Sequence, residues 1–193
     1  MSLLKVNYEL YNEANELSGE SDRAAAIVGA SLLENLLESI LKKAMVEHQQ
    51  VKNMFKGYAP LATFKSKIDL AFFLGLVPHT SIYDDLHKIR ETRNDFAHGH
   101  KELSFSEESI KNRIHTFNIL TLYRKSLQLD ERIEDPPDEE IKAFIETAKS
   151  PRKMWELEIL NLYNLLSKYL EFTKKPTLKE NRRIYIAGAE NED

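Results

Sequence analysis

Apolar residues along most of this chain recur three or four positions apart, which is the spacing of one face of an α-helix. Turn-forming Gly and Pro residues interrupt the pattern, and residues 49–63 have the composition of a loop. The pattern predicts a single all-α domain, a helical bundle of six or seven helices over residues 1–175, followed by a flexible C-terminal tail over 176–193. The helices are expected over about 3–17, 21–48, 63–74, 80–98, 106–129, 138–148 and 151–170.

Small residues gather at the start of the helix predicted over 21–48, from Ala24 to Ala30 with Gly29 among them. They let another helix approach closely, while leucines and isoleucines further along fill a core. We expect this small-residue face to form a two-fold contact, so that the protein is a homodimer. The alternative is that the face is used entirely inside one chain.

A positive charge interrupts the apolar stripe of the helix predicted over 80–98. At 100° per residue, Arg93 falls near the middle of the stripe, which predicts that its side chain points inward. A guanidinium keeps its proton, so an inward arginine needs carboxylates, carbonyls or a bound anion around it. Glu34 and Glu38 are the first candidates for this ion pair, and Asp22 is another. The full set of candidates for structural ion pairs is Asp22, Arg23, Glu34, Glu38, Arg90 and Arg93.

A second, polar ridge lies on another face of the same helix, where Arg90, Asn94 and His98 follow at intervals of four residues. His98 precedes Gly99 and so lies in a last turn, where free carbonyls favour a protonated ring. One interpretation is a helix-terminal histidine bonded to those carbonyls, and the other is a binding or catalytic group. On a straight helix, Arg93 and His98 diverge by about 140°, so a joint site would favour contributions from two subunits.

Composition narrows the function classes. The 193 residues carry a net charge of −4, so no overall positive field draws the protein to nucleic acid, and direct DNA binding is not favoured. The absence of cysteine excludes disulfides, thiol nucleophiles and cysteine-ligated zinc. We expect no bound metal and no cofactor. The start lacks a signal-peptide core, and no apolar run is expected to span a membrane, so a cytoplasmic protein is predicted.

Three stretches together resemble the mannitol operon repressor family, the MltR-like proteins. They are Ser21–Arg23 with Gly29–Ala30, then Pro60–Lys67 running into Leu74–Leu76, and finally Ile89–His98. The likeness covers roughly residues 5–170. The resemblance implies an all-helical, non-enzymatic transcriptional regulator that has no DNA-binding motif of its own and acts through protein partners.

A looser resemblance is to the HEPN superfamily of helical domains, some of which are metal-independent ribonucleases. Its mark is an arginine, a following polar residue and a histidine a few positions on, which Arg93, Asn94 and His98 match. This resemblance implies the alternative function of an endoribonuclease that binds RNA. In it Arg93 would stabilise phosphate charge, Asn94 would orient the phosphate, and His98 would move a proton.

Overall fold

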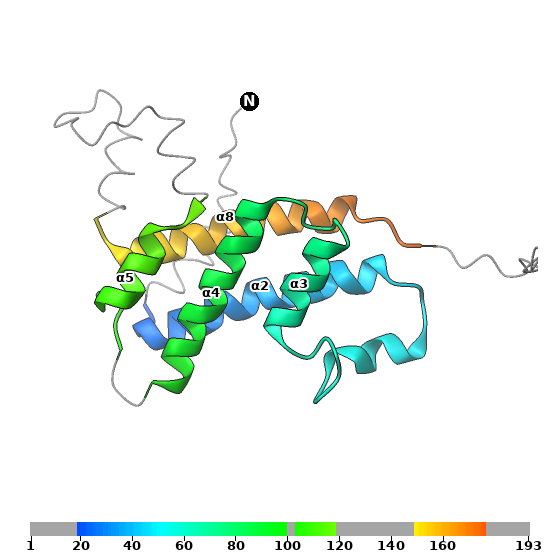
Figure 1. The fold of residues 1–193 in the computed structure, drawn as a ribbon, viewed down its shortest axis with the longest axis horizontal. Coiled ribbons are helices and arrows are strands. Elements are labelled where there is room, and N and C mark those ends of the chain that lie inside the picture. Colours follow the sequence, from blue (N-terminus) through cyan, green and yellow to red (C-terminus); the bar gives the residue numbers. More distant parts are fainter. Residues whose placement is uncertain (1–18, 100–102, 119–148, 177–193) are drawn as a thin grey trace, which may run out of the picture.

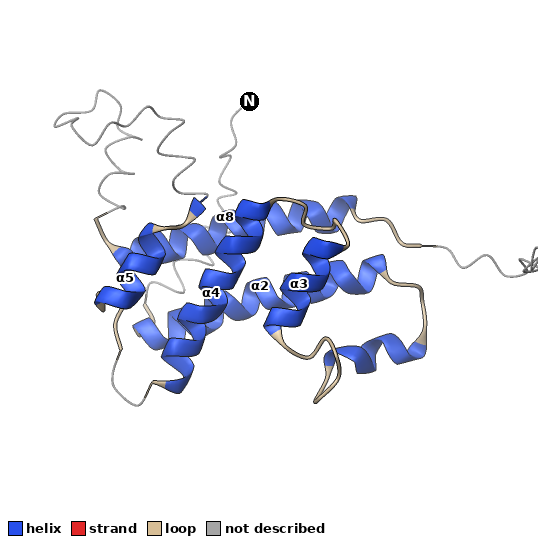
Figure 2. Cartoon of the chain, viewed as in Figure 1, coloured by secondary structure: helices blue, strands red, loops and turns tan. Residues whose placement is uncertain are grey.

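The computed structural model describes residues 19–99, 103–118 and 149–176, and within these ranges every regular element is a helix (Figure 2). The elements are α2 (Asp22–Ala44), the 3₁₀ helix η1 (Gln49–Phe55), α3 (Phe64–Phe73), α4 (Thr80–His98), α5 (Glu108–His115) and α8 (Pro151–Phe172). The all-α single-domain prediction is confirmed. The helices predicted over 3–17 and 138–148, and the tail from 177, lie outside the described residues.

The two longest helices, α2 and α8, lie side by side (Figure 1). The shorter helices α3 and α4 both pack against α2. The hydroxyl of Ser21 accepts a hydrogen bond from the Ala24 N–H and so caps the start of α2. Ser150 caps α8 in the same way, with proline at its first position. Both helix starts therefore agree with the sequence prediction, whereas α2 ends at Ala44, where Met45 is extended.

The small-residue face of α2 is used inside the chain. Ala25, Ala26 and Ala30 are buried, and a Cβ atom added to Gly29 would lie 3.1 Å from Ile159 Cγ1 on α8. Glycine thus lets the two long helices approach closely. This is the intramolecular alternative, so the face offers no support for a dimer, and the homodimer stays a prediction.

By length and composition, α2 could cross a membrane. This differs from the sequence prediction that the chain contains no apolar segment long enough to span one. The structure gives a different reason for that hydrophobicity. α2 packs against α8, α4 and α3, and several of its apolar side chains have no exposed surface. These are Leu33, Leu37, Ile40 and Leu41. A core helix of a bundle passes the same length and composition test, and α2 is interpreted here as such a helix.

An aromatic cluster fills the core at the end formed by α4, α5 and α8. Trp155 of α8 has its ring centroid 5.5 Å from that of Phe105 and 6.3 Å from that of Phe117. The Phe105 ring is in turn 4.9 Å from the ring of Phe96 in α4. All four rings are fully buried or nearly so. They join α4, α8, the connection after α4 and the chain just after α5 into one packed unit.

Two segments differ from the sequence prediction. Residues 49–55 form η1 rather than an irregular loop, and its last residue, Phe55, is buried beneath the ammonium group of Lys42. The helix predicted from 106 to about 129 is α5, which ends at His115. There the Thr116 N–H and hydroxyl both donate to the Arg113 carbonyl, which closes a turn. Residues from 119 onward lie outside the described part.

Cations from neighbouring helices bind the carbonyl ends of three helices. Arg23 of α2 donates to the carbonyls of Phe96 and Gly99 at the end of α4, over 2.7 and 2.6 Å. Lys43 of α2 donates to Leu170 at the end of α8, and Lys88 donates to Thr116 after α5. The C-terminus of a helix carries a partial negative charge, so each contact holds two elements together.

Candidate functional site

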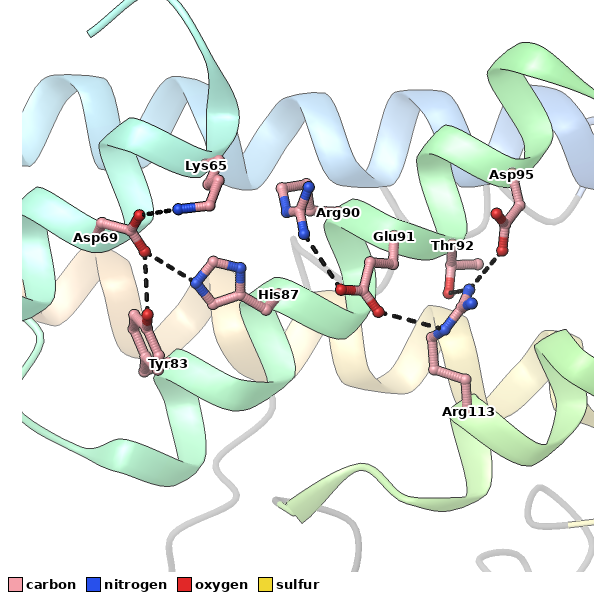
Figure 3. A network of polar contacts seen from close by, with 9 residues as sticks. All are labelled: Lys65, Asp69, Tyr83, His87, Arg90, Glu91, Thr92, Asp95 and Arg113. Atoms are coloured by element: carbon pink, nitrogen blue, oxygen red, sulfur yellow. Dashed lines mark hydrogen bonds and ion pairs between the residues drawn. The ribbon is translucent and has the colours of Figure 1, made fainter. Parts of the chain in front are cut away.

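The outward face of α4 carries polar side chains that meet partners from α3 and α5 (Figure 3). The inward face of α4 consists of Ile82, Asp85, Leu86, Ile89, Thr92 and Phe96. Alternating intervals of three and four residues keep these on one side of the helix. The opposite side of α4 contacts α3 through the first half of α4 and contacts α5 through the second half of α4.

Asp69 of α3 is the centre of the first polar cluster. One of its oxygens accepts from the Tyr83 hydroxyl at 3.0 Å and lies 3.1 Å from His87 Nε2, while the other accepts from Lys65. A carboxylate only accepts, so His87 must carry a hydrogen on Nε2. Burial alone would raise the pKa of Asp69, but the bonds from Lys65 and Tyr83 outweigh it and lower that pKa.

The second cluster joins α4 to α5. Arg113 of α5 donates to Asp95 at 2.6 Å and to the Thr92 hydroxyl at 3.2 Å, and its Nε lies 3.8 Å from Glu91. Glu91 also accepts from Arg90 at 3.2 Å. Charges of opposite sign therefore alternate along the helix surface. We call the two clusters together the α4 polar face, which consists of Lys65, Asp69, Tyr83, His87, Arg90, Glu91, Asp95 and Arg113 (Figure 3).

An apolar edge adjoins this polar face at the end of α3. Phe73 and Leu74 are 73% and 56% exposed, although both are large and hydrophobic. The Phe73 ring centroid lies 6.4 Å from that of Tyr83, and the Phe72 ring is 4.5 Å from the same tyrosine. Exposed apolar side chains beside a patterned polar surface are typical of protein interaction sites.

The sequence prediction for Arg93 is wrong. Arg93 is half-buried and donates to Asn94 Oδ1 at 3.1 Å, and among the described residues no carboxylate lies within ion-pair distance of it. Thr92 takes the inward position instead. The buried face of α4 includes Asp85 and Thr92. Arg93 follows Thr92 directly and is therefore rotated by about 100° from it around the helix axis, away from the centre of the buried face.

Lys67 of α3 takes the role predicted for Arg93. Its Nζ lies 2.9 Å from both Glu34 and Glu38 of α2, and its side chain is only 5% exposed. Glu34 and Glu38 are therefore structural ion-pair residues, as predicted, with a different partner. A signal for Lys67 was present in the sequence, because it lies within the apolar stripe of Phe64, Ile68 and Ala71.

The other ion-pair candidates have separate roles. Asp22 accepts from the Phe105 N–H at 2.9 Å and pairs with Arg152 at 2.8 Å, so it joins α2 to α8 and to the connection after α4. Arg23 binds carbonyls, and Arg90 pairs with Glu91. No hydrogen bond or ion pair joins any of these three residues to Arg93 in the described part of the chain.

The structure does not assemble the catalytic alternative within one chain. His98 is exposed at the last position of α4, and across the described ranges no hydrogen bond joins it to Arg93 or Asn94. Arg93 and Asn94 are bonded to each other. In the same ranges, no group of three His, Cys, Asp or Glu residues is placed to hold a metal ion.

Comparisons with known proteins were made for the whole chain. A search of curated proteins finds no match. A solved structure described as the MtlR–HPr complex from Escherichia coli matches with a TM-score of 0.56 and 19% sequence identity, over 84% of this chain and 99% of that chain. At this identity the likeness shows the fold. The family model of the mannitol repressor, MtlR, matches residues 8–160, and the chain therefore belongs to the mannitol repressor family.

Proposed function

We propose that this protein is a non-enzymatic, cytoplasmic regulator of transcription that acts by binding a protein partner. The observation that carries the proposal is the family match over residues 8–160, which includes α2, α3, α4 and α5. The structurally similar protein from Escherichia coli was solved in complex with HPr, so an HPr-type protein is the first partner to test. Homodimerisation is compatible with this function and is tested by the mass in light scattering.

We further propose that the partner docks on the α4 polar face and the apolar edge beside it. The exposed Phe73 and Leu74 supply apolar area that would lose water on binding. The alternating charges of Arg90, Glu91 and Arg113 supply a pattern that selects a complementary partner surface. Because each pair is solvated, it adds little to the stability of the free protein.

The first prediction is that purified HPr from the organism of this chain binds the protein, as measured by isothermal titration calorimetry. Phe73→Ala and Arg90→Ala should each weaken the affinity tenfold or more if they lie at the centre of the interface. Glu47→Gln, which alters an exposed ion pair with Lys175, is the control and should bind as the wild type does. If neither Phe73→Ala nor Arg90→Ala changes the affinity, this surface is excluded as the docking site. If the wild type does not bind HPr, HPr is excluded as the partner.

The second candidate function is the metal-independent endoribonuclease. The observation that favours it is the guanidinium of Arg93, which is bonded to the amide of Asn94 and has no carboxylate partner in the described part of the chain. Such a cation could bind an RNA phosphate. It is ranked second because His98 does not meet these residues within one chain.

The second prediction separates the two functions. The regulator should leave single-stranded RNA intact over hours with or without chelator, because an acidic protein attracts RNA poorly. A ribonuclease of the proposed type should cleave in chelator and lose the activity in His98→Ala and in Asn94→Ala, each still folded by circular dichroism. Chelator-resistant cleavage lost in both variants would overturn the regulator-only function, whereas equal cleavage in all preparations would indicate contamination.

A further inference from the structure

Two acidic residues from different helices meet inside the bundle. Asp85 of α4 and Glu158 of α8 are both completely buried, and their carboxyl groups lie close enough to act on each other. Two ionised carboxylates cannot stay this close in a buried site, because their repulsion adds to the cost of removing both from water. One of the two groups must therefore be protonated or be neutralised in another way.

Asp85 is the group that is arranged as an anion. The Asn118 backbone N–H donates to both of its oxygens, at 2.9 and 2.8 Å, and the Asn118 side-chain amide donates at 3.1 Å. The ammonium group of Lys88 adds a further contact at 3.0 Å. Several donors and one cation stabilise the charged form of a carboxyl group.

Glu158 is arranged as the neutral acid. No N–H or hydroxyl donor of the described residues reaches either of its oxygens, and the Asp85 carboxyl group is close enough to act on it. Two carboxyl groups can share a hydrogen bond only when one supplies the hydrogen. Because Asp85 already accepts from Asn118 and Lys88, the donor must be Glu158.

The charged groups that act on Glu158 come from α4 alone within the described residues. Asp85 opposes its ionisation and Lys88 favours it, while the chain after α5 presents the uncharged Asn118. On the side facing α2, the neighbouring positions of α8 contact Gly29, which carries no charge. Burial is the largest effect, followed by Asp85, and together they raise the pKa of Glu158 well above 4.5.

We propose that Asp85 and Glu158 share one proton, and that this pair makes the core packing around Glu158 and the anchoring of Asn118 dependent on pH. When the proton is lost, a second negative charge appears in the contact, and the donors around Asp85 cannot balance both groups. The core packing around Glu158 and the attachment of the chain at Asn118 then weaken together. This inference does not depend on the proposed function.

The direction of the pH effect follows from the protonation states. The unfolded chain releases the Glu158 proton near pH 4.5, whereas the folded chain holds it to a higher pH. The stabilising contribution is complete below pH 4.5 and decreases as the pH rises toward the folded pKa. Over that interval, the ratio of folded to unfolded protein should fall by up to tenfold per pH unit from this one group.

Urea unfolding of the wild type and of Glu158→Gln from pH 5 to 9 tests the proposal. Glutamine keeps the shape and an N–H donor toward Asp85 without a titrating proton, so its stability should depend less steeply on pH. The difference in pH dependence between the wild type and Glu158→Gln should approach the value for the release of one proton on unfolding. Glu171→Gln, at an exposed position in the last turn of α8, is the control and should keep the wild-type slope. Equal slopes for the wild type and Glu158→Gln would overturn the proposal.

Infrared spectroscopy of the folded wild type gives a second measurement, which can be made even if the Glu158→Gln variant does not fold. Above about pH 6, where ordinary carboxyl groups are ionised, the wild type should show the C=O stretch of one protonated carboxylic acid, with the band lost as the pH rises further. Glu158→Gln, if folded, should lack the band. Absence of the band from the folded wild type at every pH above about 6 would mean that both groups are ionised, and would overturn the proposal by itself.

Discussion

Lys67→Ala is expected to lower the free energy of unfolding by about 3 kcal/mol, measured by urea denaturation at pH 7. The reason is that Lys67 is buried and its removal leaves Glu34 and Glu38, one helical turn apart, without the cation between them. The value is at the lower end of the range for breaking a buried pair, because both glutamates keep some contact with water and Glu38 keeps Lys42.

The pH dependence of this effect has a defined sign. Burial raises the pKa of Glu38, but the bonds from Lys42 and Lys67 outweigh it and hold that pKa below 4.5. A lowered pKa contributes stability above pH 4.5 that is lost as the pH falls through the folded value. The difference between the wild type and Lys67→Ala should therefore shrink in acid, since the stranded carboxylates become neutral.

Arg93→Ala is the matched comparison, because Arg93 is the residue that the apolar stripe of α4 singled out. Its guanidinium is half-buried and, among the described residues, is hydrogen-bonded only to Asn94, so its loss should cost less than about 1 kcal/mol. A cost for Arg93→Ala as large as that for Lys67→Ala would contradict the assignment of the buried cation to α3.

Local patterns predicted the α-helices, because each of them buries one face and some begin at a recognisable capping residue. The starts of α2 at Ser21 and of α8 at Ser150 are examples, since a hydroxyl side chain caps each of them. The close approach at Gly29 was also expected from the small residues around it. In contrast, the sequence did not reveal the early end of α5, because the turn at Thr116 uses ordinary residues.

The candidate site could be predicted only in part. That α4 has a polar face follows from its periodicity, but the partners of that face come from α3 and α5. Asp69 is 18 residues from His87, and Arg113 is likewise 18 residues from Asp95, and both pairs depend on how the helices cross. The error at Arg93 has the same origin, because the side of α4 that is buried depends on where its neighbours pack.

Trp155→Ala is expected to lower the free energy of unfolding by about 3–5 kcal/mol, which is the usual cost of removing a large aromatic side chain from a core. Trp155 has no exposed surface and fills the space between Phe105, Phe117 and Gly29. Its loss would leave a cavity where α2, α8 and the chain around α5 meet. Urea denaturation at pH 7, with the slope of the transition unchanged, measures this difference.

Trp155→Phe is the control for that variant and should cost less than about 1.5 kcal/mol, because it keeps an aromatic ring in the core. The indole N–H is buried without an acceptor among the described residues, so phenylalanine removes an unpaired polar atom together with some volume. The two effects have opposite signs and partly cancel. Equal costs for Trp155→Phe and Trp155→Ala would contradict an unpaired N–H and would indicate that the indole nitrogen contributes a hydrogen bond to the fold.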